Sequence, residues 1–168
     1  RDLHSFPTRR SSDLMGDSGT KMFFFGTYNH NIDDKSRCTL PQKFREKLGS
    51  KVYVTKGYDH CLYIYPEETF LKIADEYSSM DELSPEERQN RRMFFASSID
   101  YDVDKAGRIT LTKDHLKRAN LDKEVVLVGN GDHVEIWSRA QYEDMDKTAD
   151  ENFERNAQII AASKKKID

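Results

Sequence analysis

The chain contains an internal repeat, and this feature constrains its fold more than any other. Asp33 and Arg37 match Asp104 and Arg108 with a shift of 71 residues. Five further positions match with a shift of 72, namely Lys51, Gly57, Ile64, Tyr65 and Phe70 with Lys123, Gly129, Ile136, Trp137 and Tyr142. Since the match extends over about 45 residues in each half, it indicates an ancient duplication.

Each half shows the same order of expected elements: strand, tight turn, strand, short helix, strand, turn, strand and helix. The turns at 33–36 and 104–107 carry the Asp and Gly residues that hairpins use. Short helices are expected over 42–48 and 113–119, closed by Gly49 and Asn120 as left-handed C-caps. Because about 45 residues are near the lower limit at which a chain buries enough apolar surface to fold alone, we expect the strands of both halves to intertwine into one pseudo-twofold barrel.

A helical connection is expected between the halves. Ser84, Pro85 and Glu87 form the pattern of an N-cap, a first-turn proline and a capping-box partner, and the preceding residues 67–80 also have a helical pattern. Ser138 and Gln141 repeat the capping-box pattern and predict a long C-terminal helix that runs towards Phe153, with its lysine-rich tail frayed.

The resulting fold class is mainly β with short helices (α+β). We expect an extraneous leader over 1–21, a first repeat over 22–68, the helical connection over 69–96, a second repeat over 97–140, and a C-terminal helix and tail over 141–168. The leader has no periodic apolar pattern and no secretory apolar run, so the natural protein is expected to start at Met22.

Composition excludes several function classes. The 168 residues are 34% charged with a formal net charge of −3, and no stretch approaches the roughly 20 apolar residues of a membrane helix. Cys38 and Cys61 lack metal-ligand spacing, so we interpret them as small buried side chains of a reduced, cytoplasmic protein. No metal, cofactor, membrane or small-molecule substrate is expected.

Positive charge gathers around the two Asp-x-x-x-Arg turns. Residues 27–58 contain seven cations against three acids, and residues 104–123 contain six against three. An arginine presents a planar set of donors that can bind guanine or phosphate, whereas an aspartate is suited to hold that arginine or the turn. A charge cluster alone is more often an ordinary solvated surface, so the charge pattern only marks candidates for contact with a nucleic acid, namely Arg37, Arg108, Asp33, Asp104, Lys35, Lys105, Lys43 and Arg45. For Lys43, Arg45 and Lys113, phosphate contact and an ordinary solvated surface are equally open.

Several aromatic side chains suit either a core or a subunit interface: Phe23, Phe24, Phe25, Phe94, Phe95 and Trp137. Core is the default expectation. Three consecutive phenylalanines in a strand must direct at least one ring outward, so the segment 23–25 is a candidate interface.

Five stretches together resemble the MraZ family of bacterial regulators, which are related to the AbrB swapped-hairpin DNA-binding proteins. They are "MFFFGTYNHNIDDKSRCTLPQKFRE", "GYDHCLYIYP", "RRMFFASS", "DKAGRITL" and "EVVLVGNGDHVEIWS", and the likeness covers Met22 to about Asp144. The resemblance implies a double AbrB-like fold and a ring-like homo-oligomer in the cytoplasm, associated with the nucleoid. It also implies binding to short direct repeats of double-stranded DNA in the promoter of the division and cell-wall gene cluster.

The resemblance assigns DNA contacts to the Asp-x-x-x-Arg pairs, which fall here on Asp33 with Arg37 and on Asp104 with Arg108. Two positions of the second repeat depart from the first. Thr112 replaces Pro41, and His115 replaces the apolar Phe44, so that Leu116 is an alternative occupant of the same pocket.

Two other functions compete with this interpretation. Asp59-His60 and Asp132-His133 recur in both halves and suit acid–base chemistry, but adjacent residues are expected to point apart, and no nucleophile, phosphate loop or zinc motif accompanies them. The second alternative is an AbrB-like protein-binding module of the antitoxin type, which would use its acidic C-terminal helix.

Overall fold

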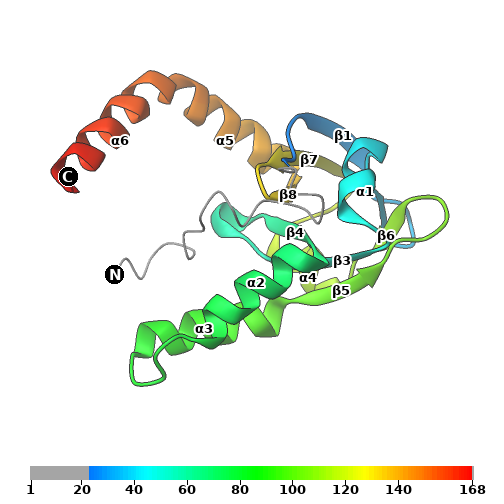
Figure 1. Ribbon diagram of the computed structural model, residues 1–168. Helices are drawn as coiled ribbons and strands as arrows, with labels where there is room; N and C mark the ends of the chain where they lie inside the picture. The colour runs from blue at the N-terminus through cyan, green and yellow to red at the C-terminus, as the bar shows by residue number, and fades with distance from the viewer. Residues whose placement is uncertain (1–22, 168) are drawn as a thin grey trace. The chain divides into compact units, whose positions relative to one another are not determined.

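A computed structural model describes residues 23–167 of the chain (Figure 1). The expected leader over 1–21 lies outside these residues. The chain divides into two compact units, one that ends at Ser138 and one that spans Arg139–Asp168.

The first unit contains the two repeats and the helices that connect them. The first half supplies β1 (Thr27–Asn31), β2 (Arg37–Thr39), α1 (Gln42–Leu48), β3 (Lys51–Lys56), a 3₁₀ turn (Tyr58–His60), β4 (Leu62–Pro66) and α2 (Glu67–Ser78). After α3 (Pro85–Ser97), the second half supplies β5 (Ile99–Asp102), β6 (Arg108–Thr110), α4 (Lys113–Arg118), β7 (Glu124–Asn130) and β8 (His133–Ser138). The C-cap prediction holds in part: Gly49 caps α1 with a φ of 85°, but its ψ of −170° is not that of a left-handed helix, and the C-cap of α4 is Ala119, followed by Asn120 with a φ of 51°.

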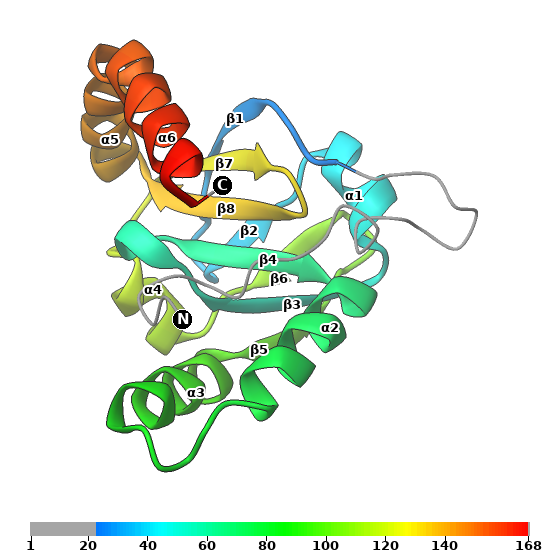
Figure 2. The ribbon, with the colours of Figure 1, turned by 60° about the vertical axis from the view of Figure 1, so that its left-hand side comes forward.

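The strands of the two halves intertwine. One antiparallel sheet has the order β1-β7-β8-β4-β3-β5, and a separate two-stranded ribbon pairs β2 with β6. When each strand is exchanged for its match in the other half, the sheet order reads the same backwards, so the unit has a pseudo-twofold axis. The pairs Cys38 with Ile109 and Tyr63 with Glu135 lie on that axis. The predicted swapped-hairpin fold is confirmed in these pairings (Figure 2).

The expected barrel is not closed. Within the described residues β1 and β5 remain the edges of the six-stranded sheet, and Cys38 of the ribbon forms an isolated bridge with Ile32, which follows β1. The reason is that β2 and β6 are three residues long and pair with each other, so neither continues the ladder of the larger sheet.

The shift of 72 that the sequence suggested for β3 and β7 is wrong by one residue. Val52 lies opposite Tyr101 and Val125 lies opposite His30, which requires a shift of 73 across these strands. Because side chains alternate along a strand, a slip of one residue would turn every buried side chain outward. Burial therefore decides the register: Val52 and Val54 match Val125 and Leu127, all fully or almost fully buried.

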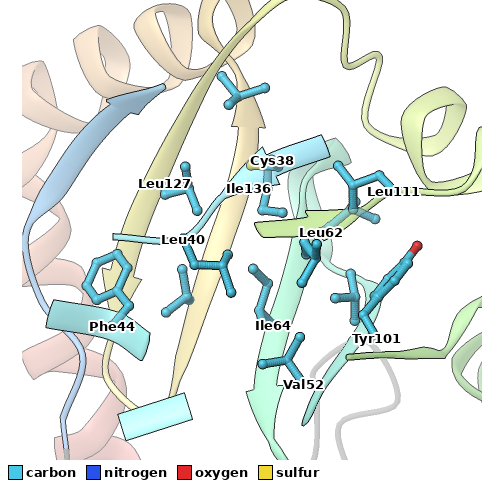
Figure 3. Close-up of a cluster of buried hydrophobic side chains, with 14 of the residues drawn as sticks. Cys38, Leu40, Phe44, Val52, Leu62, Ile64, Tyr101, Leu111, Leu127 and Ile136 are labelled. Atoms are coloured by element: carbon cyan, nitrogen blue, oxygen red, sulfur yellow. The ribbon is translucent and has the colours of Figure 1, made fainter. Parts of the chain in front are cut away.

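The core lies between the six-stranded sheet and the ribbon (Figure 3). Leu62, Ile64 and Ile136 project from the sheet and meet Leu40 from the first half, all 0% exposed. The ring of Phe44 on α1 packs edge-on against Tyr28, with centroids 5.1 Å apart. Each half thus contributes side chains to one shared core, as expected for repeats too small to fold alone.

His115 takes the place of Phe44 in the second half and is itself fully buried, whereas Leu116 is half-buried beside the core. The imidazole Nε2 lies 2.7 Å from the carbonyl oxygen of Ser97, and Nδ1 lies 2.7 Å from the hydroxyl of Tyr101. Since a carbonyl only accepts, Nε2 carries a proton, and the neutral ring accepts from Tyr101 at Nδ1. Thr112 replaces Pro41 as the N-cap and accepts from the backbone N–H of His115 at 3.3 Å.

The connection is helical, as predicted. Ser84 caps α3 and accepts from the backbone N–H of Glu87 at 3.2 Å. The reciprocal half of the capping box differs, because a carboxylate oxygen of Glu87 accepts from the backbone N–H of Asp81 at 3.3 Å. Phe94 of α3 is buried and stacks on Tyr77 of α2 at 4.2 Å, which fixes the two helices against each other.

The outward-facing aromatic side chains also follow expectation in part. Phe24 is 3% exposed, whereas Phe23 and Phe25 beside it are 41% and 58% exposed. Phe94 and Trp137 are core residues, but Phe95 is 42% exposed. The consecutive phenylalanines therefore divide between core and surface, with Phe24 in an isolated bridge to Gly131 ahead of β1.

The second unit consists of α5 (Arg139–Glu151) and α6 (Phe153–Ile167). The single C-terminal helix expected from the sequence is thus two helices, interrupted at Asn152, and the lysines at 164–166 are helical rather than frayed. Positive charges in a last helical turn interact favourably with the helix dipole, which favours helix at this end. No helix within residues 23–167 combines the length and apolar character needed to cross a bilayer.

Candidate nucleic-acid interface

The turn between β1 and β2 is organised by the side chain of Asp33. One carboxylate oxygen accepts from the backbone N–H groups of Lys35 and Arg37, at 3.0 and 2.9 Å. The other oxygen accepts from the Nε–H of Arg37 at 2.6 Å. Ser36 closes the turn with a positive φ of 61° and donates its N–H to the Asp33 carbonyl. Asp33 therefore fixes both the backbone turn and the direction of the arginine.

The turn between β5 and β6 repeats this geometry in the second half. Asp104 accepts from the backbone N–H groups of Ala106 and Arg108, both at 2.9 Å, and from the Nε–H of Arg108 at 3.0 Å. Gly107 takes the place of Ser36, with a φ of 80°. This turn projects at the right-hand edge of Figure 1, between β5 and β6. The two motifs predicted from the sequence are thus the same local structure.

Both arginines lie on one face of the β2–β6 ribbon. Arg37 pairs with Thr110 and Arg108 with Thr39, while Cys38 pairs with Ile109 between them. Cys38 and Ile109 are 0% exposed and face the core, so by strand alternation the two arginines face away from it. They are diagonal neighbours on this face, a relation that places such residues about 7–8 Å apart.

The carboxylates leave the outer edge of each guanidinium available. The side chains of Arg37 and Arg108 are 30% and 31% exposed, and only Nε contacts the aspartate. Within residues 23–167 the terminal nitrogens of both arginines have no hydrogen-bond partner. Backbone N–H donation from Arg37 and Arg108, together with their guanidinium groups, lowers the pKa of Asp33 and Asp104, so both acids stay charged near neutral pH.

Each turn is also held by the opposite repeat. The N–H of Leu40 donates to the carbonyl of Gly107, and the N–H of Leu111 donates to the carbonyl of Ser36, both at 2.9 Å. These bonds extend the β2–β6 pairing by one step at each end. Neither turn is therefore a free loop of its own half, and the ribbon presents both on one surface.

The remaining candidate cations have different surroundings. Lys35 and Lys105 are exposed at the tips of the two turns. Lys43 on α1 lies over the ring of Phe25, with its Nζ 4.3 Å from the centroid. Arg45, also on α1, lies against Gly107 of the second turn. The structure thus brings Arg45 to the turns but gives Lys43 an aromatic partner from the N-terminal segment.

The Asp-His pairs do not behave alike. His133 Nδ1 lies 2.6 Å from a carboxylate oxygen of Asp132, so the expectation that these neighbours point apart is wrong for the second half. The same ring packs on Tyr63, with centroids 4.2 Å apart. In the first half, Asp59 and His60 both have a positive φ, near 62° and 65°. No group of three or more His, Cys, Asp or Glu residues in the described part of the chain is arranged to hold a metal ion.

The two cysteines are free and buried, which agrees with their interpretation as small core residues. Burial raises the pKa of the Cys38 thiol to about 12, so it remains protonated on the pseudo-twofold axis.

Sequence reasoning missed two features of this interface, the register of the β2–β6 pairing and a contact between the two repeats. The common face of the two arginines depends on the β2–β6 register, which no local motif reports. The contact between Arg45 and Gly107 joins residues from different repeats. The only available signal was the presence of glycine at 107 where the first half has Ser36, at a position that requires positive φ.

The intertwined sheet and its paired turns define a double swapped-hairpin protein of the AbrB-like class. A family model described as "MraZ protein, putative antitoxin-like" matches residues 23–93 and again 94–161. The chain belongs to the MraZ family.

Curated relatives support this membership. The chain is 39% identical over 137 residues to the "Transcriptional regulator MraZ" of Desulforamulus reducens, covering 82% of this chain and 96% of that protein. It is 39% identical over 140 residues to the protein of the same name from Mesoplasma florum, covering 83% and 96%. The protein of that name from Mycolicibacterium smegmatis is 41% identical over 130 residues, covering 77% and 91%.

Proposed function

We propose that this chain is a sequence-specific DNA-binding transcriptional regulator that acts through the β2–β6 ribbon. The observation that carries the proposal is the common outward face of Arg37 and Arg108, each oriented by an aspartate at Nε with its terminal nitrogens available. The names of the curated relatives support a role in transcription.

The ribbon suits the major groove of double-stranded DNA. That groove is about 12 Å wide and admits a two-stranded β-ribbon, and guanine presents there two acceptors that one arginine can bind together. Two arginines separated by about 7–8 Å fit within one groove. The aspartates do not contact the negatively charged DNA favourably, so their role is to hold each arginine in a fixed direction. Lys35, Lys105 and Lys43 are assigned to phosphates.

Two arginines that contact bases give one protomer few specific contacts with DNA. The proposal therefore includes self-association. A protomer that binds mainly by electrostatics has roughly micromolar or weaker affinity. A ring-like homo-oligomer that presents several ribbons to several short direct repeats would strengthen binding by about 10²–10⁴. The target that the family resemblance suggests is the promoter of the division and cell-wall gene cluster, and with such a target the protein would act in the cytoplasm on the nucleoid. The exposed rings of Phe23 and Phe25 offer apolar surface for such an assembly.

The test is a titration of labelled duplexes at fixed salt, with direct repeats spaced by about 10 base pairs and with a scrambled control. Arg37→Ala and Arg108→Ala should each lose preference for the repeat duplex, by about 1–3 kcal/mol per lost bidentate contact. Arg139→Ala is the matched control, because it breaks an i,i+4 arginine–carboxylate pair with the same 3.0 Å Nε distance as Arg108, outside the turns. Equal binding by all three variants would refute the proposal.

A second candidate function is protein binding of the antitoxin type. The family description and the exposed apolar side chains of Phe153, Ile159 and Ile160 on α6 favour it. Pull-down with and without nuclease separates the two functions, because a partner retained after nuclease treatment is bound to protein rather than to DNA.

A further inference from the structure

Arg45 from the first repeat covers the turn of the second. A Cβ atom placed on Gly107 would lie 2.7 Å from Nε of Arg45 and closer still to Nη1. Gly107 is buried although it lies in a projecting turn. The guanidinium plane is thus in contact with the backbone of the turn that carries Asp104 and Arg108, at a position where no side chain fits.

In this contact, part of the Arg45 guanidinium group is buried in an unfavourable environment. Within residues 23–167 its Nε is buried and has no hydrogen-bond partner. A surface cation free to solvate itself would not adopt that position, so the contact with the turn is part of the packing. The planar and weakly hydrated guanidinium group is suited to stacking on flat groups, whereas a lysine ammonium is not.

Among residues 23–167, no side chain covers the first turn in the same way. Ser36 stands where the second turn has Gly107, and Leu116 stands where the first half has Arg45. Leu116 packs against the core instead. The pseudo-twofold symmetry of the unit is therefore broken at this contact, and the two turns are held differently.

We propose that Arg45 is a positioning residue for the second turn, through which the first repeat controls the DNA contact made by Arg108. Leu40, also from the first repeat, donates its N–H to the carbonyl of Gly107, so the glycine is held on two sides by the other half. With Arg45 in place, Asp104 keeps its bonds to Arg108 and directs the guanidinium outward. This inference rests on the proposed DNA-binding function of Arg108.

A double-mutant cycle on the full chain tests the proposal. Arg45→Ala should weaken binding to the direct-repeat duplex by the same factor in the parent and in Arg37→Ala, and should have no further effect in Arg108→Ala. If Arg45 instead contacted a phosphate directly, Arg45→Ala would weaken binding further in both Arg37→Ala and Arg108→Ala. It would also lower by about one the slope of binding affinity against salt concentration on logarithmic scales. That additive result, or no effect of Arg45→Ala on a duplex that the parent binds, would overturn the positioning role.

A measurement without DNA separates failure of this inference from failure of the proposed function. The backbone N–H of Arg108 bonds to Asp104, and that of Arg37 bonds to Asp33, so the same molecule contains its own control. In Arg45→Ala, hydrogen exchange at Arg108 should accelerate on the order of tenfold while exchange at Arg37 stays constant. Arg45→Lys keeps the charge and should behave like Arg45→Ala.

The outcomes are distinct. Faster exchange confined to Arg108, in a protein that binds no duplex, would retain the positioning role and refute the DNA-binding function. Unchanged or equally accelerated exchange at both sites would refute the positioning role, whatever the DNA result. Restoration of both readouts by lysine would show that charge alone matters and would also overturn it.

Discussion

The fully buried His115 predicts that the protein loses stability as the pH falls. Its ring is neutral and holds two hydrogen bonds of 2.7 Å, one donated to the Ser97 carbonyl and one accepted from Tyr101. Protonation of Nδ1 would set an N–H against the hydroxyl hydrogen that Tyr101 now donates. Burial lowers the pKa of His115 below its usual 6.5, against smaller opposing effects of the Ser97 carbonyl and Asp114.

The sign and size of the effect follow from linkage. Because the pKa is lowered in the folded state, the unfolded chain takes up the proton first as the pH falls through 6.5. The stabilisation is complete above that pH and is lost below it, down to the folded pKa. When only the unfolded state binds this one proton, the free energy of unfolding falls by at most about 1.4 kcal/mol per pH unit.

The assay is urea unfolding between pH 7.5 and 5, compared between the parent and His115→Phe. Phenylalanine is the residue of the matching position in the first half, so it suits the pocket, but it leaves the Ser97 carbonyl without its donor. The variant should be less stable at pH 7.5 and should lose stability less steeply towards pH 5. If His115→Phe fails to fold, the parent protein provides the test instead. As the pH falls, the ring signals of its His115 should stay those of a neutral imidazole until the protein unfolds. Parallel stability profiles, or a ring that titrates near 6.5 in the folded protein, would refute the reasoning.

Further predictions concern the second turn, the shared core and the carboxylates. In urea unfolding, Gly107→Ala should lower the free energy of unfolding more than Gly131→Ala. Both substitutions replace a glycine of positive φ, 80° and 77°, which alone costs about 1–2 kcal/mol, but only Gly107→Ala displaces Arg45. Adding Arg45→Ala should remove the excess, and an unchanged excess would contradict the contact. Phe44→Ala, at 1% exposure, should lower the free energy of unfolding by about 3–5 kcal/mol, whereas Leu71→Ala, at 53%, should change it by less than about 0.5 kcal/mol. Asp104→Asn should weaken binding to the repeat duplex with little change in stability; undiminished affinity would show that Arg108 needs no carboxylate to direct it.

Much of the fold could be predicted because the duplication limits the possible arrangements. Two copies of a pattern too small to fold alone must share a core, and the strand alternation within each copy states which faces meet. The helix α3 could be placed because Ser84 and Pro85 are local signals for a helix start, and the structure shows Ser84 as its cap.

The sequence-based predictions were wrong where contacts between distant residues determine the structure. Gly57 and Gly129 look equivalent in sequence, but Gly129 lies within β7 against the backbone of Phe25, and the true register is set by burial of Val125 and Leu127. Closure of the barrel depends on strand length: β2 and β6 are too short to extend the larger sheet. A histidine in an apolar position could not be placed from sequence, because its partners Ser97 and Tyr101 come from elsewhere in the chain.

The two motifs of the candidate site were predictable, but the strand pairing that joins them was not. The spacing of aspartate and arginine within each turn is local, and both turns have the expected geometry. Their common face is a consequence of the pairing of Cys38 with Ile109 across the two halves. Arg45 illustrates the same limit, since its contact with Gly107 joins residues that are distant in sequence.

The central claim is that two turns from two repeats form one DNA-binding face. Hydrogen–deuterium exchange of the full chain with and without a direct-repeat duplex tests it most directly. Peptides covering 33–40 and 104–111 should both gain protection, while those covering α3 at 85–97 should not. Protection confined to one turn, or confined to α3, would contradict the account.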